Sequence, residues 1–302
     1  MSSEQQKGTW YAAAAYGIWG FVPIYWKWLQ EIPALQLICH RIIWSSVLLL
    51  AIVVGSHNWS ALWHAARSRR VIGIYAAAAV VVGINWFVYV WAVNAGFIMQ
   101  TALGYFINPL VSVFLGVLVF HEKLRPWQWV AIGLACLGVL TLTAVHGSLP
   151  WIALALAFSF GTYGLLKKMA PLGAIQGLAL ETSILFVPAI VYLMYVDRLG
   201  TGGFGHAGGV RTLLMVGTGP VTTLPLLLFA AAIRRIPLSA MGMLQYINPT
   251  MQFLIGVLLY KEPFTSAQFV GFGIVWAALA MYAVEGYVTG RNRALPPVLR
   301  RG

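Results

Sequence analysis

The sequence predicts an all-α polytopic membrane protein, and three observations point to that fold class. Apolar residues make up 60% of the 302 residues. Charged residues make up only 9%, against about 25% in an ordinary soluble chain. The apolar residues fall into stretches of about 20, the length at which a helix crosses a bilayer. These observations exclude a disordered chain, a coiled coil and a soluble enzyme, whose surface needs far more polar side chains.

Ten such stretches follow one another, and most of the loops between them are short. Consecutive helices are therefore expected to pack as antiparallel neighbours. The predicted spans are residues 9–26, 33–54, 71–93, 100–120, 126–144, 149–166, 174–195, 211–233, 238–260 and 265–287. The two longer connections, residues 55–70 and 196–210, are predicted to be loops.

Basic residues lie mainly on one side of these spans. If the N-terminus is inside, 14 of the 19 Lys and Arg residues fall on the inner side, 4 fall on the outer side, and Arg41 lies within a span. Cytoplasmic loops of membrane proteins carry such an excess. We therefore expect a multi-pass protein of the bacterial inner (plasma) membrane, with both termini and a basic tail at residues 288–302 in the cytoplasm. Because these short basic runs explain the net charge of +12, no nucleic-acid partner is expected.

The second half of the chain repeats the first. A shift of 140 residues places Ile107-Asn108-Pro109 on Ile247-Asn248-Pro249. Each repeat holds five spans, an odd number, so the second repeat (149–287) is expected to be inverted relative to the first (9–144). Inverted repeats are typical of secondary transporters, whose substrate site lies near the bilayer midplane between the halves.

Five stretches carry a resemblance to known proteins: His40-Arg41-Ile42-Ile43-Trp44-Ser45, Asn85-Trp86, Val93-Asn94-Ala95, Gly104-Tyr105-Phe106-Ile107-Asn108-Pro109 and Leu244-Gln245-Tyr246-Ile247-Asn248-Pro249. As a set they resemble the EamA-type permeases of the drug/metabolite transporter superfamily, and within them the RarD branch, which is named for chloramphenicol sensitivity. The two repeats fill nearly the whole chain. The resemblance implies ten helices, a central cavity and transport of small metabolites or drugs, with export as the common direction.

Charged side chains inside the spans are the first candidates for a transport site, because each costs about 2.5–3.5 kcal/mol at the bilayer centre. The second span carries His40 and Arg41, and the seventh carries Glu181. A shift of 141 residues places His40 on Glu181, so both are expected to face a central cavity. Arg41 or His40 would then bind an anionic substrate group, and Glu181 or His40 would carry a proton, because arginine does not deprotonate in proteins. The alternative is a structural ion pair or hydrogen bond that locks the two halves together.

Further polar and aromatic residues lie at membrane depth, where each either binds substrate or bridges helices. The candidates for substrate binding or coupling are Asn85, Asn94, Gln245, Tyr105 and Tyr246. Asn108-Pro109 and Asn248-Pro249 are predicted near the starts of the fourth and ninth spans, where each proline removes a helix hydrogen bond. Matched helix breaks point to a transport site, and we expect these four residues to act as hinges more than as substrate contacts.

Glycines and glutamates mark where helices should meet. Gly133, Gly138, Gly271 and Gly273 on the fifth and tenth spans predict close helix contact, within the fold or in a dimer. Glu122 and Glu262 occupy matching loops and are expected to hold the ends of the fourth and ninth helices.

No cofactor or metal is expected. The chain lacks the G-x-x-x-x-G-K-[ST] motif of an ATP-binding loop, and Cys39 and Cys136 have no neighbour at metal-ligand spacing. Residues Gly200–Gly205 fit G-x-G-x-x-G, but no βαβ strand precedes them, and they are interpreted as a flexible linker.

Together these features predict a secondary transporter rather than an enzyme. It is expected to export a small molecule by alternating access, coupled to protons, as a monomer or a homodimer. Two alternatives stay open: an uncoupled facilitator of the same fold, and an intramembrane enzyme that uses His40, Arg41 and Glu181. No nucleophile–base spacing supports the enzyme.

Overall fold

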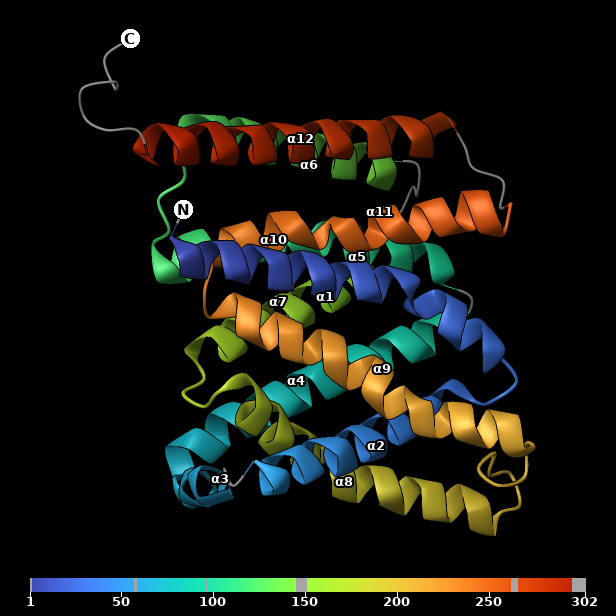
Figure 1. The fold of residues 1–302 in the computed structure, drawn as a ribbon. Coiled ribbons are helices and arrows are strands. Elements are labelled where there is room, and N and C mark those ends of the chain that lie inside the picture. Colours follow the sequence, from blue (N-terminus) through green and yellow to red (C-terminus); the bar gives the residue numbers. More distant parts are fainter. Residues whose placement is uncertain (1, 57–58, 96, 145–150, 262–265, 295–302) are drawn as a thin grey trace.

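The computed structural model describes residues 2–56, 59–95, 97–144, 151–261 and 266–294 (Figure 1). Every regular element in this part of the chain is helical, which confirms the all-α prediction. In a lipid environment the helix satisfies each backbone group within its own segment, and long apolar runs favour it for that reason. The elements are α1 (Ser3–Trp28), α2 (Ala34–Gly55), α3 (Trp59–Arg67), α4 (Arg69–Asn94), α5 (Ile98–Phe120), α6 (Pro126–Ala144), α7 (Trp151–Met169), α8 (Ala174–Arg198), α9 (Gly209–Ile233), α10 (Leu238–Gln245), α11 (Ile247–Leu254), a π-helical segment (Ile255–Leu259) and α12 (Ser266–Ala294).

All ten predicted spans fall on helices. The span at 238–260 is divided among α10, α11 and the π-helical segment, and each of the others coincides with one long helix. Among the described residues, seven helices are long and apolar enough to cross a membrane: α2, α4, α5, α6, α8, α9 and α12. The chain is therefore a multi-pass membrane protein. Residues 149, 150 and 265 of the predicted spans, and residues 295–302 of the predicted tail, lie outside the described part of the chain.

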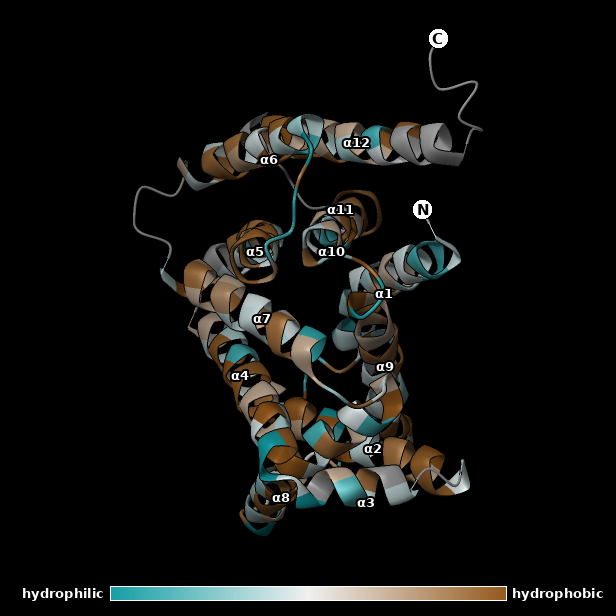
Figure 2. Cartoon of the chain, turned by 90° about the vertical axis from the view of Figure 1, so that its left-hand side faces the viewer, coloured by the Kyte–Doolittle hydropathy of each residue, from teal (hydrophilic) through white to brown (hydrophobic). Residues whose placement is uncertain are grey.

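Helices at matching positions of the two repeats pack on each other. Helix α2 packs on α8, α5 on α10, and α6 on α12. Helix α1 packs on α9 and α4 packs on α7, so these contacts also come as a matched pair. Figure 2 looks along many of the helices and places the α6–α12 layer at one side of the bundle. Such reciprocal packing is what two halves related by a pseudo-two-fold axis would produce.

Small residues allow the closest of these approaches. A Cβ on Gly242 of α10 would lie 2.5 Å from the carbonyl oxygen of Pro109 on α5. A Cβ on Gly138 of α6 would lie 3.0 Å from the carbonyl oxygen of Gly271 on α12. The predicted close contact of the fifth and tenth spans is thus within the fold at Gly138 and Gly271, as expected for small residues in membrane helix interfaces.

The other two glycines singled out for that interface have a different environment. A Cβ on Gly133 or on Gly273 would meet nothing within 4 Å. Neither residue is therefore needed for close packing inside the chain.

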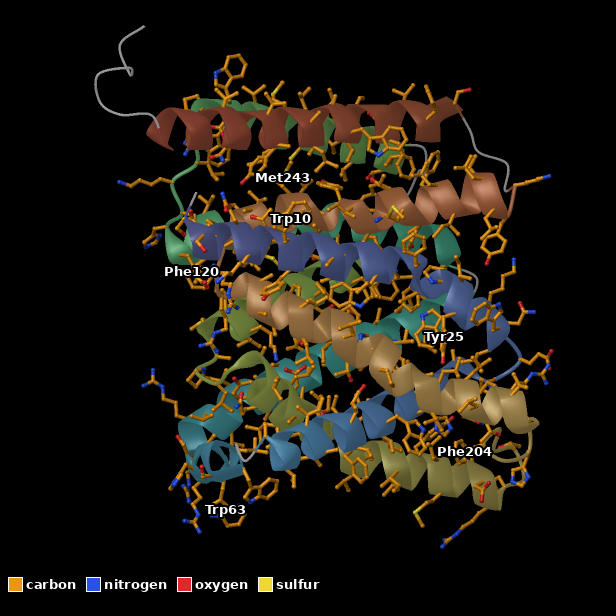
Figure 3. The ribbon with its side chains drawn as sticks, in the orientation of Figure 1. Trp10, Tyr25, Trp63, Phe120, Phe204 and Met243 are labelled. Atoms are coloured by element: carbon orange, nitrogen blue, oxygen red, sulfur yellow. The ribbon has the colours of Figure 1, made fainter. Side chains whose placement is uncertain are left out.

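The connection at residues 55–70, predicted as a loop, contains helix α3. This helix is drawn end-on in Figure 1 and lengthwise in Figure 2, so it lies across the ends of the bundle helices. Leu62 and Ala65 are buried, whereas Trp59 and Trp63 are about half exposed, and the Arg67 guanidinium lies 4.9 Å from the Trp63 ring centroid. Trp63 points away from the bundle (Figure 3). A helix of nine residues is too short to register as a span, which explains the wrong prediction.

The two Asn-Pro pairs lie in different local structures. Helix α5 continues through Pro109, which lies midway along it and not near its start. In the second repeat the helix is interrupted at Tyr246, between α10 and α11, so Asn248-Pro249 does lie in the first turn of a helix. A proline is tolerated in a first turn because its missing N–H has no intrahelical partner there. The predicted matched breaks are therefore one break and one continuous helix.

Candidate functional site

A small cavity lies between α4, α5 and α7 and brings together three of the predicted site residues. Its volume is about 20 Å³, enough for roughly one water molecule. It is lined by Asn85, Tyr89, Thr101, Gly104, Tyr105, Asn108, Leu156 and Phe160. The predicted residues Asn85, Tyr105 and Asn108 therefore share one site, although they come from two helices.

The polar groups of this cavity are not equally engaged. The Asn85 side-chain amide donates to the Leu156 carbonyl (2.9 Å) and to the Ser159 hydroxyl (2.8 Å) on α7. Asn108 is 4% exposed, and its Oδ1 atom has no hydrogen-bond partner. A buried amide oxygen without a donor costs about 1–3 kcal/mol. The cavity therefore offers one unpaired acceptor to whatever enters it.

Arg41 on α2 does not line this cavity, but it contacts Trp86, the chain neighbour of the lining residue Asn85. Its Nε atom donates to the Thr222 hydroxyl at 3.0 Å, and its guanidinium lies 4.6 Å from the ring centroid of Trp86 and 5.1 Å from that of Trp26. Arg41 is thus a cation held between two aromatic faces, which attract it without neutralising its charge.

Helix α9, which supplies Thr222, carries two prolines that the sequence analysis did not single out. Pro220 and Pro225 lie inside the helix on either side of Thr222. Each removes one backbone hydrogen bond and weakens the helix locally. The proline pair, five residues apart in one apolar stretch, was a readable signal of a deformable helix next to the site.

Glu181 pairs with a residue that was not predicted to be part of the site. Its Oε2 atom accepts a hydrogen bond from Lys167 Nζ at 2.8 Å, and both side chains are 3% exposed. The Lys167 ammonium lies 5.5 Å from the ring centroid of Tyr75 and 5.7 Å from that of Tyr163. Lys167 was counted only as a membrane-edge anchor because its neighbour Lys168 made the pair look like a basic loop.

Arg41 and Glu181 lie at different levels along the bundle. Each stands seven residues after the start of its helix, which corresponds to about 10 Å of helix. Helices α2 and α8 run in opposite directions (Figure 1). The structure therefore does not bring His40, Arg41 and Glu181 together in one charged wall. The ion pair of Glu181 lies within the second repeat, whereas the hydrogen bond from Arg41 to Thr222 joins the two halves.

His40 belongs to a third location, under the connection between α8 and α9. It is 3% exposed, its ring stacks on Phe204 at a centroid distance of 5.1 Å, and its Nε2 atom has no hydrogen-bond partner. The Gln36 side chain donates to the Thr201 carbonyl (2.8 Å) and accepts from the Gly203 amide (2.9 Å). Figure 3 places Phe204 at the end of the bundle opposite Trp63.

The interpretation of residues 200–205 as a flexible linker is therefore wrong. The connection folds back onto α2 and is fixed there by two hydrogen bonds to one glutamine. Its glycines serve backbone geometry: Gly200 and Gly205 have φ values of 72° and 78°, which favour glycine. Composition alone did not reveal this, because Gln36 lies about 165 residues away in the chain.

The remaining predicted residues of the second repeat lie where helices cross. Gln245 accepts from the Ser112 hydroxyl at 3.5 Å, and Tyr246, which is fully buried, donates to the Phe106 carbonyl at 3.2 Å. Asn248 accepts from the Gln252 amide at 2.9 Å. Gln245 and Tyr246 thus connect the second repeat to α5, whereas the Asn248–Gln252 hydrogen bond lies within α11. The side chain of Asn94 lies outside the described part of the chain.

Glu122 joins the two halves of the chain. Its carboxylate accepts hydrogen bonds from the backbone amides of Leu238 (2.6 Å) and Ser239 (2.9 Å), at the start of α10. A carboxylate is favourable there because the first amides of a helix point outward with partial positive charge. Lys168 lies 3.8 Å away from the same carboxylate. Glu122 therefore holds the start of α10, and Glu262 lies outside the described residues.

Comparison with known proteins adds the family. Residues 6–144 match the model of the EamA-like transporter family. The chain is 42% identical to "Protein RarD" of Streptomyces exfoliatus over 96% of this chain and 92% of that protein. It is 43% identical to "Uncharacterized transporter YojE" of Bacillus subtilis (strain 168) over 93% of this chain and 94% of that protein.

A solved crystal structure has a similar fold. It aligns with a TM-score of 0.68 at 16% sequence identity, over 92% of this chain and 97% of that chain. The arrangement of helices described above is thus found in an experimental structure. With the family model and the near-complete alignments to RarD proteins, the chain belongs to the EamA-like transporter family, as a RarD-type permease.

Proposed function

We propose that this permease is a secondary transporter that exports small metabolites or drugs by alternating access. It would cross the bacterial inner membrane ten times as two inverted halves of five helices, with both termini in the cytoplasm. The reciprocal packing of matching helices supports this arrangement. The start of α1 and the end of α12 lie at the same end of the bundle (Figure 1), as an even number of crossings requires.

One observation carries the transport proposal: a small cavity between α4, α5 and α7 into which buried polar residues are gathered. The buried Asn108 oxygen has no partner and lines a cavity together with Asn85 and Tyr105. An unsatisfied polar group at membrane depth is costly and usually functional. A substrate with an N–H or O–H donor would satisfy it.

Closure at the two ends of the bundle would rest on different contacts. At one end the connection between α8 and α9 is fixed on α2 by Gln36, with Phe204 stacked on His40. At the other end Lys167 pairs with Glu181, and Glu122 holds the start of α10. In alternating access, each set would break while the other stays intact.

The ion pair suits proton coupling. A proton on Glu181 would remove the negative charge that holds Lys167 and would weaken the closure at that end. His40 is the other candidate proton carrier. In an uncoupled facilitator the ion pair would be structural only, and flux would ignore a pH gradient.

Counterflow in proteoliposomes tests the proposal. Vesicles that contain the purified protein are loaded with one compound at a time from a broad panel of metabolites and drugs. Uptake of the labelled compound by exchange is compared with that of protein-free vesicles. Saturable exchange of at least one compound class is expected, and Asn108→Leu should reduce it while Gly17→Ala, which meets no neighbour within 4 Å, should not. Recovery of the compound chemically unchanged separates transport from an intramembrane enzyme. Absence of exchange across the panel by folded protein would refute transport.

Coupling requires a second measurement on the same vesicles. Net flux is followed with and without an imposed pH gradient for the wild type and for Glu181→Gln. Gradient-driven flux that Glu181→Gln loses, while exchange persists, is the expected result. Flux that is indifferent to the gradient would favour the uncoupled facilitator.

A further inference from the structure

Every acidic side chain in the described part of the chain lies close to a basic side chain other than Arg41. The chain has seven Asp and Glu residues, and six of them lie in the described part. Each of the six lies within 4 Å of a basic side chain. The pairs are Glu4 with Lys7 and with Arg235, Glu31 with Arg211, Glu122 with Lys168, Glu181 with Lys167, Asp197 with His206, and Glu285 with Arg125. None of these six carboxylates is paired with Arg41.

Arg41 is therefore a cation inside the bundle whose described protein partners are all neutral. Its hydrogen bond goes to the Thr222 hydroxyl, and its faces meet Trp26 and Trp86. A guanidinium carries five N–H donors in a planar fork, so most of its donor capacity is left for another group. Charge at membrane depth is usually paired. Among the described residues no carboxylate supplies a counterion to Arg41, so an anion that binds there would do so.

The ion pair of Glu181 and Lys167 supports the same conclusion. Glu181 and Lys167 neutralise each other at 2.8 Å and are both 3% exposed. The site thus carries the single positive charge of Arg41 and not a balanced pair. A cationic substrate would meet repulsion here, and a neutral one would leave the charge uncompensated.

The neighbouring cavity adds a second requirement. The unpaired Asn108 oxygen accepts but does not donate, so it calls for an N–H or O–H on the substrate. The aromatic faces of Trp26 and Trp86 favour an apolar body next to the guanidinium.

We propose that the substrate is a small organic monoanion, whose carboxylate binds the Arg41 fork between Trp26 and Trp86 and whose hydroxyl or N–H group bonds to Asn108. This inference names the substrate class of the proposed transporter and so rests on that function. Bidentate binding of a carboxylate by arginine supplies both charge and geometry. The negative charge of the substrate would neutralise the positive charge of Arg41.

A charge-matched panel tests the inference. The probes are aliphatic and aromatic hydroxy monocarboxylates, each with its primary amide and its primary amine, so that size and shape stay nearly constant while charge changes. Binding to purified protein is measured by equilibrium dialysis, and exchange is measured by counterflow. We expect the carboxylates to bind about 10- to 100-fold more tightly than their amides, as charge-assisted hydrogen bonds would give, and the amines to bind weakest.

Three variants identify the residue responsible. Arg41→Gln should abolish the preference for the carboxylate, and Arg41→Lys should keep it with weaker affinity, because lysine provides a point charge without the fork. Lys27→Gln is the matched control: it removes an exposed cation one residue from Trp26 and should change nothing. The lysine variant also serves if Arg41→Gln does not fold.

Several results would overturn the inference. They are carboxylates that bind no better than amides, no binding of any carboxylate by folded protein, or a preference that survives Arg41→Gln or is lost in Arg41→Lys. Counterflow of neutral or cationic compounds without carboxylates would reject the substrate class while leaving the transporter function intact. Absence of all exchange would reject the function as well.

Discussion

The buried pair of Lys167 and Glu181 gives the sharpest stability prediction. Replacing Glu181 by Gln leaves the ammonium of Lys167 in an environment where both side chains are 3% exposed. The Tyr75 and Tyr163 rings, at 5.5 and 5.7 Å, offset only part of the lost attraction. We therefore expect each single replacement, Glu181→Gln or Lys167→Met, to destabilise the protein strongly.

The separation of the charges sets the magnitude. At an effective dielectric constant of about 20, two unit charges 2.8 Å apart attract each other by roughly 6 kcal/mol. Desolvation of each ion costs several kcal/mol, so the net contribution of the intact pair is small. Breaking a buried pair costs about 3–5 kcal/mol because one charge remains. The double variant Lys167→Met/Glu181→Leu removes both charges and should recover most of that loss.

Thermal unfolding followed by tryptophan fluorescence in detergent measures these differences. Each single variant should lower the Tm by roughly 5–15 °C, and the double variant should return most of the way to the wild type. Glu4→Gln is the control, because Glu4 forms its ion pairs on the exposed start of α1 and should leave the Tm unchanged. A Glu181→Gln variant that unfolds at the wild-type temperature would refute the reasoning, as would a double variant no more stable than the single ones.

Two further predictions concern packing and closure. Gly242→Ala should destabilise the crossing of α10 and α5, because the new Cβ would approach the Pro109 carbonyl oxygen to 2.5 Å. Gly17→Ala, with no neighbour within 4 Å, should be neutral or stabilising by up to about 1 kcal/mol. Equal Tm values for the two variants would contradict this prediction. Gln36→Leu should speed hydrogen exchange of the Gly203 amide, whose hydrogen bond it removes, while exchange in α7 stays unchanged; unaltered exchange at Gly203 would contradict the proposed role of Gln36.

The helices could be predicted from the sequence because apolarity is a local property. The prediction for residues 126–144 coincides with α6, and that for residues 33–54 differs from α2 by one residue at each end. Helix α3 was missed because its stability comes from contacts of Leu62 and Ala65 with the rest of the bundle and not from a long apolar run. A break was predicted at both Asn-Pro pairs, and the structure has one only near Asn248-Pro249, at Tyr246; the local sequence does not distinguish the two positions.

The site could be predicted only in part. Arg41 and Glu181 could be singled out as costly residues at membrane depth, because that cost depends on residue type and position alone; Asn108 was singled out as a hinge residue instead. Their partners depend on which helices meet, and that information is not local. Lys167 was within reach, because it lies 14 residues before Glu181 across a tight helix hairpin.

The two repeats differ in what contacts the charged residue on their second helix. In each repeat a charged residue on the second helix contacts the helix before it: Glu181 meets Lys167, and Arg41 meets the ring of Trp26. A shift of 141 residues places Trp26 on Lys167 and His40 on Glu181, so Arg41 lies one position beyond the residue that matches Glu181. A transporter built only for symmetrical closure would do better with an ion pair, or with no charge, at both ends. Trp26 contacts the guanidinium of Arg41 without neutralising its charge, which is the arrangement that the proposed anion site requires.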